Sequence, residues 1–381
     1  MSVDPHRTER DDSSGLNSDA SAAIDRRRFV RRAGTAAMLP WLPKVLGSCT
    51  ATRADSTAAA AVPPQGLGND YLVHGLTGMA RACQKPGWFQ AHWGAAVLAA
   101  HYLCRDNPLD ARLVRAVRTQ ADALIDKQAF YFRPLEGGAP DPQLTARVAA
   151  ALEQPIAGLR SHGHAATFAA LALRALRDAP SMATPQVVDG LCAISQRIGR
   201  NRPLLDHAFN RQHPLEDYGD ERSLAEALFA CTLRYEGIRY PGFAANAARR
   251  PNFTHQSTYT DALIQLHRMG YHDLARRGHA AHRIYVNTAP AKDLPRGRPM
   301  HPRARFDVVM SADFWELESN IRAWSADFSD KERMGDWLVG HVFKGLYALA
   351  RLRRLVHDPE TVRRVDQIVL ERYVDPTVAG G

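Results

Sequence analysis

Four histidines occupy equivalent positions in a repeated sequence block, and they are the strongest candidates for chemistry. Each precedes a run of small and apolar residues: His92, His164, His255 and His341. Neutral imidazole is both the metal-binding form and the general-base form of histidine. Three or four imidazoles suit iron, copper or zinc, and nickel as well. A purely structural interpretation stays open, in which the histidines of the repeat hydrogen-bond neighbouring loops and pack in the interior.

The repeat predicts the elements that position these histidines. Each block predicts a helix that begins near its histidine, then a polar turn, then a second and more charged helix. These second helices are predicted over Ala111–Ile125, Gln186–Ile198, His272–Tyr285 and Glu360–Tyr373. A degenerate block without the histidine begins near Ser223, and further helices are expected near Thr145–Leu152 and Phe314–Trp324.

This arrangement predicts an all-α fold. The first helices are apolar nearly all round and should be buried, whereas the charged second helices should form an outer layer. An inner ring inside an outer ring is an α/α toroid, and a superhelical stack is the alternative. Long insertions at about 129–160, 201–221 and 288–312 argue against a regular solenoid, and insertions of this length often carry function. We therefore expect the four histidines, with His162 nearby as a fifth metal ligand, to converge at one mouth of the toroid.

Acidic residues form a second candidate constellation. Asp217, Tyr218 and Asp220 lie in the second insertion, and Glu316 lies after the third. Paired carboxylates could act as general acid and base, as in glycoside hydrolysis, or could orient metal-binding histidines. The same residues are equally typical of a solvated turn and of the first turn of a helix. Tryptophans and other aromatic residues nearby, including Trp88 and Phe89, could stack on a ring-shaped ligand or pack in the core.

The N-terminal residues resemble a targeting address. Arg26-Arg27-Arg28-Phe29-Val30-Arg31 precedes a weakly apolar stretch, which resembles a twin-arginine export signal. Leu46-Gly47-Ser48-Cys49 resembles a lipobox, which implies lipidation of Cys49; soluble release near Ala58–Ala61 is the alternative. We therefore expect a signal peptide over 1–48, a flexible tether over 49–68 and one toroid domain over 69–381.

Composition excludes several classes of protein. The chain has 381 residues, of which 45% are hydrophobic and 23% charged, so it is neither disordered nor collagen-like. Five cysteines are too few for a dense disulfide framework, and those after Cys49 are expected to be free. The net charge of +9 is dispersed and accompanies no nucleic-acid-binding motif, so no nucleic-acid partner is expected. Phosphate-binding loops, HExxH pairs and GxSxG elbows are missing from the sequence.

Two segments resemble the questin oxidase-like family of helical oxygenases. They are "HQSTYTDALIQLHRMGYHDLARRGHAAHRIY" at 255–285 and "WLVGHVFKGLYALARL" at 337–352. The resemblance covers under a third of the chain. It implies oxidative ring cleavage or Baeyer–Villiger-type chemistry on a polycyclic aromatic substrate.

These observations predict an exported, membrane-anchored helical enzyme with a histidine-lined cavity. We expect it to be a metal-assisted oxidoreductase that acts on a small organic substrate, aromatic ones included. A periplasmic polysaccharide lyase or glycosidase is the first alternative, and a non-catalytic ligand-binding lipoprotein is the second. The expected partners are the twin-arginine export machinery, a membrane surface reached through the lipid anchor, and a small-molecule or glycan ligand.

Overall fold

The computed structural model describes 66–203, 216–238, 253–287, 289–290, 292, 294–297, 299–317 and 340–374. All of these residues belong to one compact unit, Val62–Gly381. The unit is mostly helical, and no strand occurs among the residues described, which confirms the all-α class. The predicted signal peptide, Cys49 and the tether up to residue 65 lie outside the described residues.

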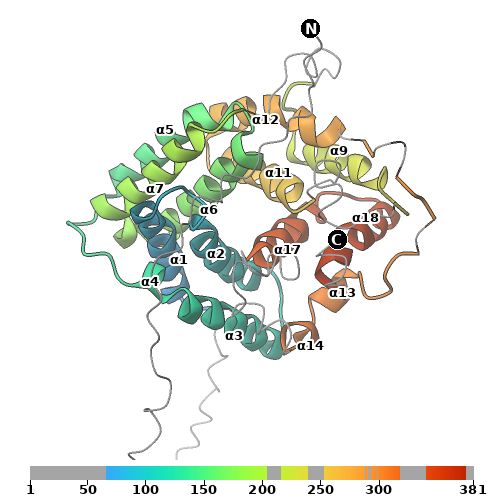
Figure 1. Ribbon diagram of the computed structural model, residues 1–381, viewed down its shortest axis with the longest axis horizontal. Coiled ribbons are helices and arrows are strands. Elements are labelled where there is room, and N and C mark those ends of the chain that lie inside the picture. The colour runs from blue at the N-terminus through green and yellow to red at the C-terminus, as the bar shows by residue number, and fades with distance from the viewer. Residues whose placement is uncertain are drawn as a thin grey trace, which may run out of the picture. The chain divides into compact units, whose positions relative to one another are not determined.

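Four helices carry the histidine-led blocks and pack against one another in a closed circle. They are α2 (Ala91–Arg105), α6 (His164–Asp178), α11 (Phe253–Arg268) and α17 (His341–Leu352). Helix α2 packs against α6, α6 against α11, α11 against α17, and α17 against α2. These inner helices lie toward the middle of Figure 1. They are almost entirely buried, and in α2 every residue from Ala91 to Cys104 is buried, because small apolar side chains let each helix contact neighbours on all sides.

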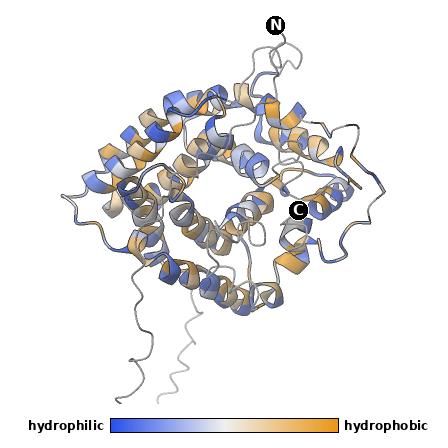
Figure 2. Ribbon diagram, in the orientation of Figure 1, coloured by the Kyte–Doolittle hydropathy of each residue, from blue (hydrophilic) through white to orange (hydrophobic). Residues whose placement is uncertain are grey.

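The second helices of the blocks pack outside the first ones. They are α3 (Ala111–Lys127), α7 (Pro185–Gly199), α12 (His272–Asn287) and α18 (Pro359–Val374), and their bounds lie within two residues of the predicted ones. Hydrophilic and hydrophobic residues alternate along them in Figure 2, as expected for helices with one buried and one solvated face. Three of them begin at side-chain caps: Asp110 accepts from the Leu113 N–H, Thr184 from the Val187 N–H, and Asp358 from the Thr361 N–H.

Further helices fill the space between the blocks. Helices α5 (Thr145–Ile156) and α9 (Glu221–Leu233) confirm two that the sequence predicts. The short helices α4 (Ala129–Phe132), α13 (Phe306–Val309) and α14 (Ala312–Trp315) lie in or beside the insertions. The helix expected over Phe314–Trp324 overlaps α14 only at Phe314 and Trp315, because α14 ends there and Glu316 and Leu317 are not helical. Residues after 317 lie outside the described part. None of the described helices has the length and apolar character that crossing a membrane requires.

Helix α1 (Asp70–Arg81) is an element that the repeat does not predict. It packs closely on α2 and also contacts α7. The close approach depends on Gly94, because a Cβ atom there would lie 2.3 Å from the backbone nitrogen of Met79. Helix α1 therefore fixes the outer side of the helix that carries His92.

Candidate metal centre

The first turns of the four inner helices bring His92, His164, His255 and His341 together, and we call this group the histidine cluster. One ring nitrogen of each lies within 4.8 Å of those of the others. The rings follow the order of the helices around the circle. Neighbouring ring centroids are 4.5 Å apart for His92–His164, 4.4 Å for His164–His255, 4.9 Å for His255–His341 and 5.0 Å for His341–His92. The convergence predicted from the repeat is confirmed.

Backbone carbonyl groups set the tautomers of two of these rings. The Nδ1 atom of His92 lies 2.6 Å from the carbonyl oxygen of Phe89, and that of His164 lies 2.5 Å from the carbonyl oxygen of Ser161. A carbonyl oxygen only accepts, so each Nδ1–H donates. In the neutral ring the lone pair is then on Nε2. His92 and His164 therefore both present an Nε2 acceptor to the cluster.

The Nε2 atoms lie a few tenths of an ångström closer together than ligands that share one tetrahedral ion. The distance is 2.8 Å between His92 and His164, and 3.0 Å between His164 and His255. Two neutral rings that both carry a lone pair on Nε2 cannot hydrogen-bond through these atoms. Nitrogens bound to one tetrahedral metal at about 2.0–2.1 Å lie about 3.3–3.4 Å apart. The donor set therefore suits a cation at its centre.

Burial favours the neutral form of three of these imidazoles. His92, His164 and His255 are all buried, and His341 is half-buried. Burial lowers the pKa of each of the first three well below 6.5, and their neighbours in the cluster add to the effect. Since neutral imidazole is the form that binds metals, the cluster is ready to act as a ligand set at neutral pH.

A strained backbone segment positions His164. Leu159, Ser161 and His162 have φ angles of 46°, 46° and 55°, and Gly163 follows at 83°. Residues with side chains rarely adopt this left-handed conformation, and such strain clusters at functional sites. Here the segment turns the carbonyl of Ser161 toward the His164 ring. A Cβ atom at Gly163 would lie 2.2 Å from the ring of Tyr259, so the tight packing requires glycine.

His162 lies beside the cluster. Its side chain is exposed, and its ring stacks on that of His255 with a centroid separation of 5.3 Å. It does not belong to the four whose nitrogens converge. The hydroxyl of Tyr285 donates to its carbonyl at 2.8 Å. His162 is thus a neighbour of a cluster member, and its role as a ligand stays a prediction.

The candidate acids near α9 have other contacts. Asp217 and Asp220 are exposed, and Asp220 is the N-cap of α9, where its carboxylate accepts from the N–H and hydroxyl of Ser223. The hydrogen bond from the Ser223 side chain lowers the pKa of Asp220. Tyr218 stacks on His267 at 4.8 Å, and burial raises its pKa to about 12. None of the three belongs to the histidine cluster.

Glu316 forms an ion pair at the surface. Its carboxylate accepts two hydrogen bonds from Arg112 of α3, at 3.2 and 2.5 Å, and Asp313 contacts the same guanidinium at 2.8 Å. These contacts account for Asp220 as a helix cap and for Glu316 as an ion-pair partner. The acid–base role of Asp217, Tyr218, Asp220 and Glu316 stays a prediction.

Aromatic side chains lie against the cluster at the start of α2. Trp88, which is half-buried, lies 4.8 Å from the His164 ring and 5.8 Å from the His92 ring between centroids. Phe89 is exposed, and its ring lies 4.5 Å from that of His92. The sequence names both residues as stacking candidates, and the structure places both beside the cluster.

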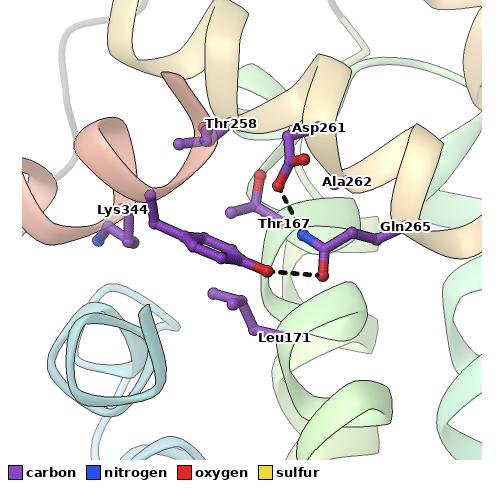
Figure 3. Close-up of a pocket in the computed structure, with 9 residues that line it drawn as sticks. Thr167, Leu171, Thr258, Asp261, Ala262, Gln265 and Lys344 are labelled. Atoms are coloured by element: carbon purple, nitrogen blue, oxygen red, sulfur yellow. Dashed lines mark hydrogen bonds between the residues drawn. The ribbon is translucent and has the colours of Figure 1, made fainter. Parts of the chain in front are cut away.

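A small cavity lies along the inner helices, and neither the cavity nor the lysine on its wall was predicted from the sequence. Its lining includes Thr167, Thr258 and Lys344, which stand three residues after the histidines of their helices (Figure 3). Since three residues make about one helical turn, the cavity begins one turn along from the cluster. Its volume of about 10 Å³ is enough for about one water molecule. A charged residue inside the otherwise apolar stretch 342–350 is the signal that could have found Lys344.

No family model, curated protein or solved structure matches this chain. The resemblance to questin oxidase-like proteins therefore stays a prediction. The functional argument rests on the geometry of the site.

Proposed function

We propose that the histidine cluster binds one ion of iron, copper or zinc, and that the protein is a metal-assisted oxidoreductase acting on a small organic substrate. The observation that carries the proposal is the meeting of two Nε2 acceptors, those of His92 and His164, at 2.8 Å. Two acceptors facing each other repel, and a shared cation makes the same contact favourable. His255 and His341 would complete the ligand set.

The bound ion would supply a redox-active or Lewis-acidic centre. The carbonyl groups that hold His92 and His164 by Nδ1 would fix ring orientation, a role that outer partners have in known metal sites. Trp88 and Phe89 support an aromatic substrate, because a planar ring could stack on them beside the cluster. A position on the half-buried side, near His341, would leave room for exchange with solvent.

The proposal extends to the architecture and location of the protein. The closed circle of packed inner helices, with a second set of helices outside them, supports an α/α toroid (Figure 1). The paired arginines and the Leu46–Cys49 segment support export by the twin-arginine machinery and a lipid anchor on Cys49. Labelling with a fatty-acid analogue tests the anchor: the wild-type chain should be labelled and a Cys49→Ala variant should not.

Elemental analysis of the purified, folded protein tests the central claim. We expect about one equivalent of iron or copper per chain. Zinc as the resident ion would retain the metal site and overturn redox chemistry at the metal, since zinc is not redox-active. Folded protein that neither carries nor takes up a transition metal would overturn both and favour a carbohydrate-active enzyme or a binding lipoprotein.

A further inference from the structure

The end of helix α7 contacts both loops whose carbonyl groups hold rings of the histidine cluster. Phe89 and Ser161 carry these carbonyl groups, and each lies three residues before its histidine, His92 or His164. Helix α7 packs against the short helix at the start of the first loop and against the short helix that contains Ser161. We call Arg197–Asn201 the α7 end, since it comprises the last turn of α7 and the two residues after it. One segment of the outer layer therefore lies beside both approaches to the cluster.

Arg197 holds the loop that leads to His92. It is half-buried, and its guanidinium donates three hydrogen bonds to backbone carbonyl groups of this loop, at 2.7 Å to Cys83, 2.6 Å to Lys85 and 2.7 Å to Gly87. At Gly87 the φ angle is 83°, and an added Cβ atom would meet no atom within 4 Å, so no neighbour packs against the loop on that side. The three hydrogen bonds therefore set the path of the chain into Phe89 and the first turn of α2.

Asn201 holds the strained segment that leads to His164. Its side-chain amide donates to the hydroxyl of Ser161, and the guanidinium of Arg160 donates to its backbone carbonyl. Three residues of this segment have a positive φ angle without being glycine, and such a conformation persists only where the surrounding structure holds it. The hydroxyl of Tyr285 holds the same segment one residue further on. Asn201 acts on Ser161 itself, whose carbonyl accepts from the His164 ring.

The rings of His92 and His164 need this support because their tautomers make an unfavourable contact when no cation is bound. Each ring donates from Nδ1 to its carbonyl, so two Nε2 acceptors face each other at 2.8 Å. If either carbonyl moved away, that ring could carry its hydrogen on Nε2 and donate it to the other ring. This change would relieve the repulsion and remove one of the two nitrogens that are available to a metal.

We propose that the α7 end fixes the tautomers of these two rings: Arg197 is a positioning residue for His92, and Asn201 is one for His164. The tautomers can be measured without metal, so this part does not depend on the proposed function. The consequence for ligand binding rests on the proposed metal site. Losing either residue should lower metal affinity by about tenfold, the lower end of the effect of losing an outer partner in known metal sites.

Nuclear magnetic resonance of the metal-free, full-length chain tests the proposal directly. With isotope-labelled histidine, long-range proton–nitrogen correlations distinguish a neutral ring that carries its hydrogen on Nδ1 from one that carries it on Nε2. His92→Gln and His164→Gln assign the signals of the two rings. In wild type we expect Nδ1–H on both. Arg197→Met should shift His92 alone toward Nε2–H, and Asn201→Ala should shift His164 alone.

Three further variants separate positioning from a general loss of packing. Arg200→Met removes an exposed arginine from the same α7 end and should leave both rings as in wild type. Ser161→Ala removes the partner of the Asn201 amide, so it should reproduce the effect of Asn201→Ala, and the double variant should add nothing to it. Arg197→Lys keeps the charge but loses the planar fork that bonds several carbonyl groups. It should shift His92 in the same direction and replaces Arg197→Met if that variant does not fold.

Unchanged tautomers in Arg197→Met and Asn201→Ala would overturn the proposal, even if both variants were less stable than wild type. Nε2–H on either ring of wild type would also overturn it, as would equal shifts of both rings in each variant. Zinc titration of the same proteins tests the consequence for ligand binding. About tenfold weaker binding in both variants, with Arg200→Met unchanged, supports that consequence, and unchanged binding alongside shifted tautomers overturns it. If the wild-type chain takes up no metal, the proposed function fails, and the tautomers still decide whether the α7 end positions the two rings.

Discussion

The two ends of the inner helices are both rich in polar groups, but those groups differ in kind. At the first turn the histidine cluster brings together four imidazoles. Ten residues further along each helix, about 15 Å away along its axis, the same register holds groups of different chemistry. They are Tyr102, Arg174, Gln265 and Arg351, and with nearby acids they form what we call the paired network.

In the paired network, donors meet acceptors. Arg174 donates to both carboxylate oxygens of Asp106, at 2.7 and 2.8 Å. Asp261 accepts from Arg351 at 2.7 Å and from the Gln265 amide at 2.6 Å, and Figure 3 shows that amide beside the carboxylate. Each of these buried charges has a partner of opposite sign, as stable interiors require.

The difference between the ends indicates which is structural and which is functional. The paired network satisfies its charges by itself, so it can stabilise the helices without a ligand. In the histidine cluster, the Nε2 acceptors of His92 and His164 face each other. Their contact becomes favourable only when a cation binds between them. A variant at one end should therefore change metal binding, and a variant at the other should change stability.

The largest expected effect is at the cluster. His164 makes both short Nε2–Nε2 contacts, one with His92 and one with His255. Replacing His164 and His255 together by alanine removes both contacts and two of the four ligands. We expect metal affinity to fall by more than about 100-fold, because losing ligands exceeds the 10–100-fold effect of losing their outer partners. Isothermal titration with zinc or copper measures it. His267→Ala/His272→Ala, another neighbouring pair at 3.2 Å, is the control and should keep wild-type affinity.

At the other end, Arg351→Met should destabilise the fold and spare the metal. The change strands the buried carboxylate of Asp261, and breaking such a pair costs about 3–5 kcal/mol. Urea unfolding of the metal-free protein measures the loss. Adding Asp261→Asn should recover part of it, since no buried charge remains. Arg363→Met, which breaks an exposed pair with Glu360, should cost less than about 1 kcal/mol. Loss of metal binding in Arg351→Met would contradict the division between the ends.

The fold was largely predictable because its local and long-range signals agree. Helical periodicity and polar turns recur in every block, so the second helices could be placed within two residues. The repeat did not predict helix α1, because the packing of α1 on α2 depends on a close approach at Gly94. No periodic pattern in the sequence indicates such an approach. The insertions were also harder to predict, since short helices such as α4 and α13 have too few residues for a period to emerge.

The site was predictable only where the repeat marks it. The four histidines share a position in the blocks, and helix geometry then requires them to meet at one end. His162 lies outside that register, and the left-handed backbone that sets its direction has no sequence signature. Asp220 and Glu316 show the limit of reading acids alone, because caps, ion pairs and catalytic acids use the same residue types. The burial of Lys344 beside the Phe168 ring could not be predicted from the sequence.

Metal should stabilise the folded protein by an amount that follows its concentration. At a free metal concentration 100 times the dissociation constant, the gain is about 2.7 kcal/mol if only the folded state binds. We expect metal to raise the free energy of unfolding of Arg351→Met by the same amount as that of wild type, although the metal-free variant is less stable. For His164→Ala/His255→Ala we expect no gain. Thermal unfolding with and without a chelator measures all three. An equal gain in the double histidine variant would place the ion elsewhere.

The smallest expected effect is a change of one proton in the pH dependence of stability. Buried histidines outside the cluster contribute to this dependence together with His92, His164 and His255. Burial lowers the pKa of His282 to about 3, and its Nε2 atom lies 2.7 Å from the hydroxyl of Thr260, which in turn donates to the Gln256 carbonyl. Below pH 6.5 the unfolded chain takes up a proton at this histidine while the folded chain does not. Stability is thus complete above about pH 6.5 and falls as the pH decreases toward 3.

The slope is about 1.4 kcal/mol per pH unit for each such histidine, and His101, whose pKa burial lowers to about 4, adds a second. In the paired network the sign is the same and the pH window is lower. Burial raises the pKa of Asp106, but the Arg174 hydrogen bonds and the charges of Arg174, Arg105 and Arg351 together lower it, so its contribution is lost only below about pH 3.8.

Urea unfolding of metal-free protein between pH 6.5 and 4.5 therefore avoids the Asp106 step. Comparison of each variant with wild type separates a histidine from Asp366, whose pKa burial raises to about 7. His282→Gln keeps an amide that can donate to Thr260 and should reduce the slope by one proton, whereas an unchanged slope would show that His282 is protonated in the folded state.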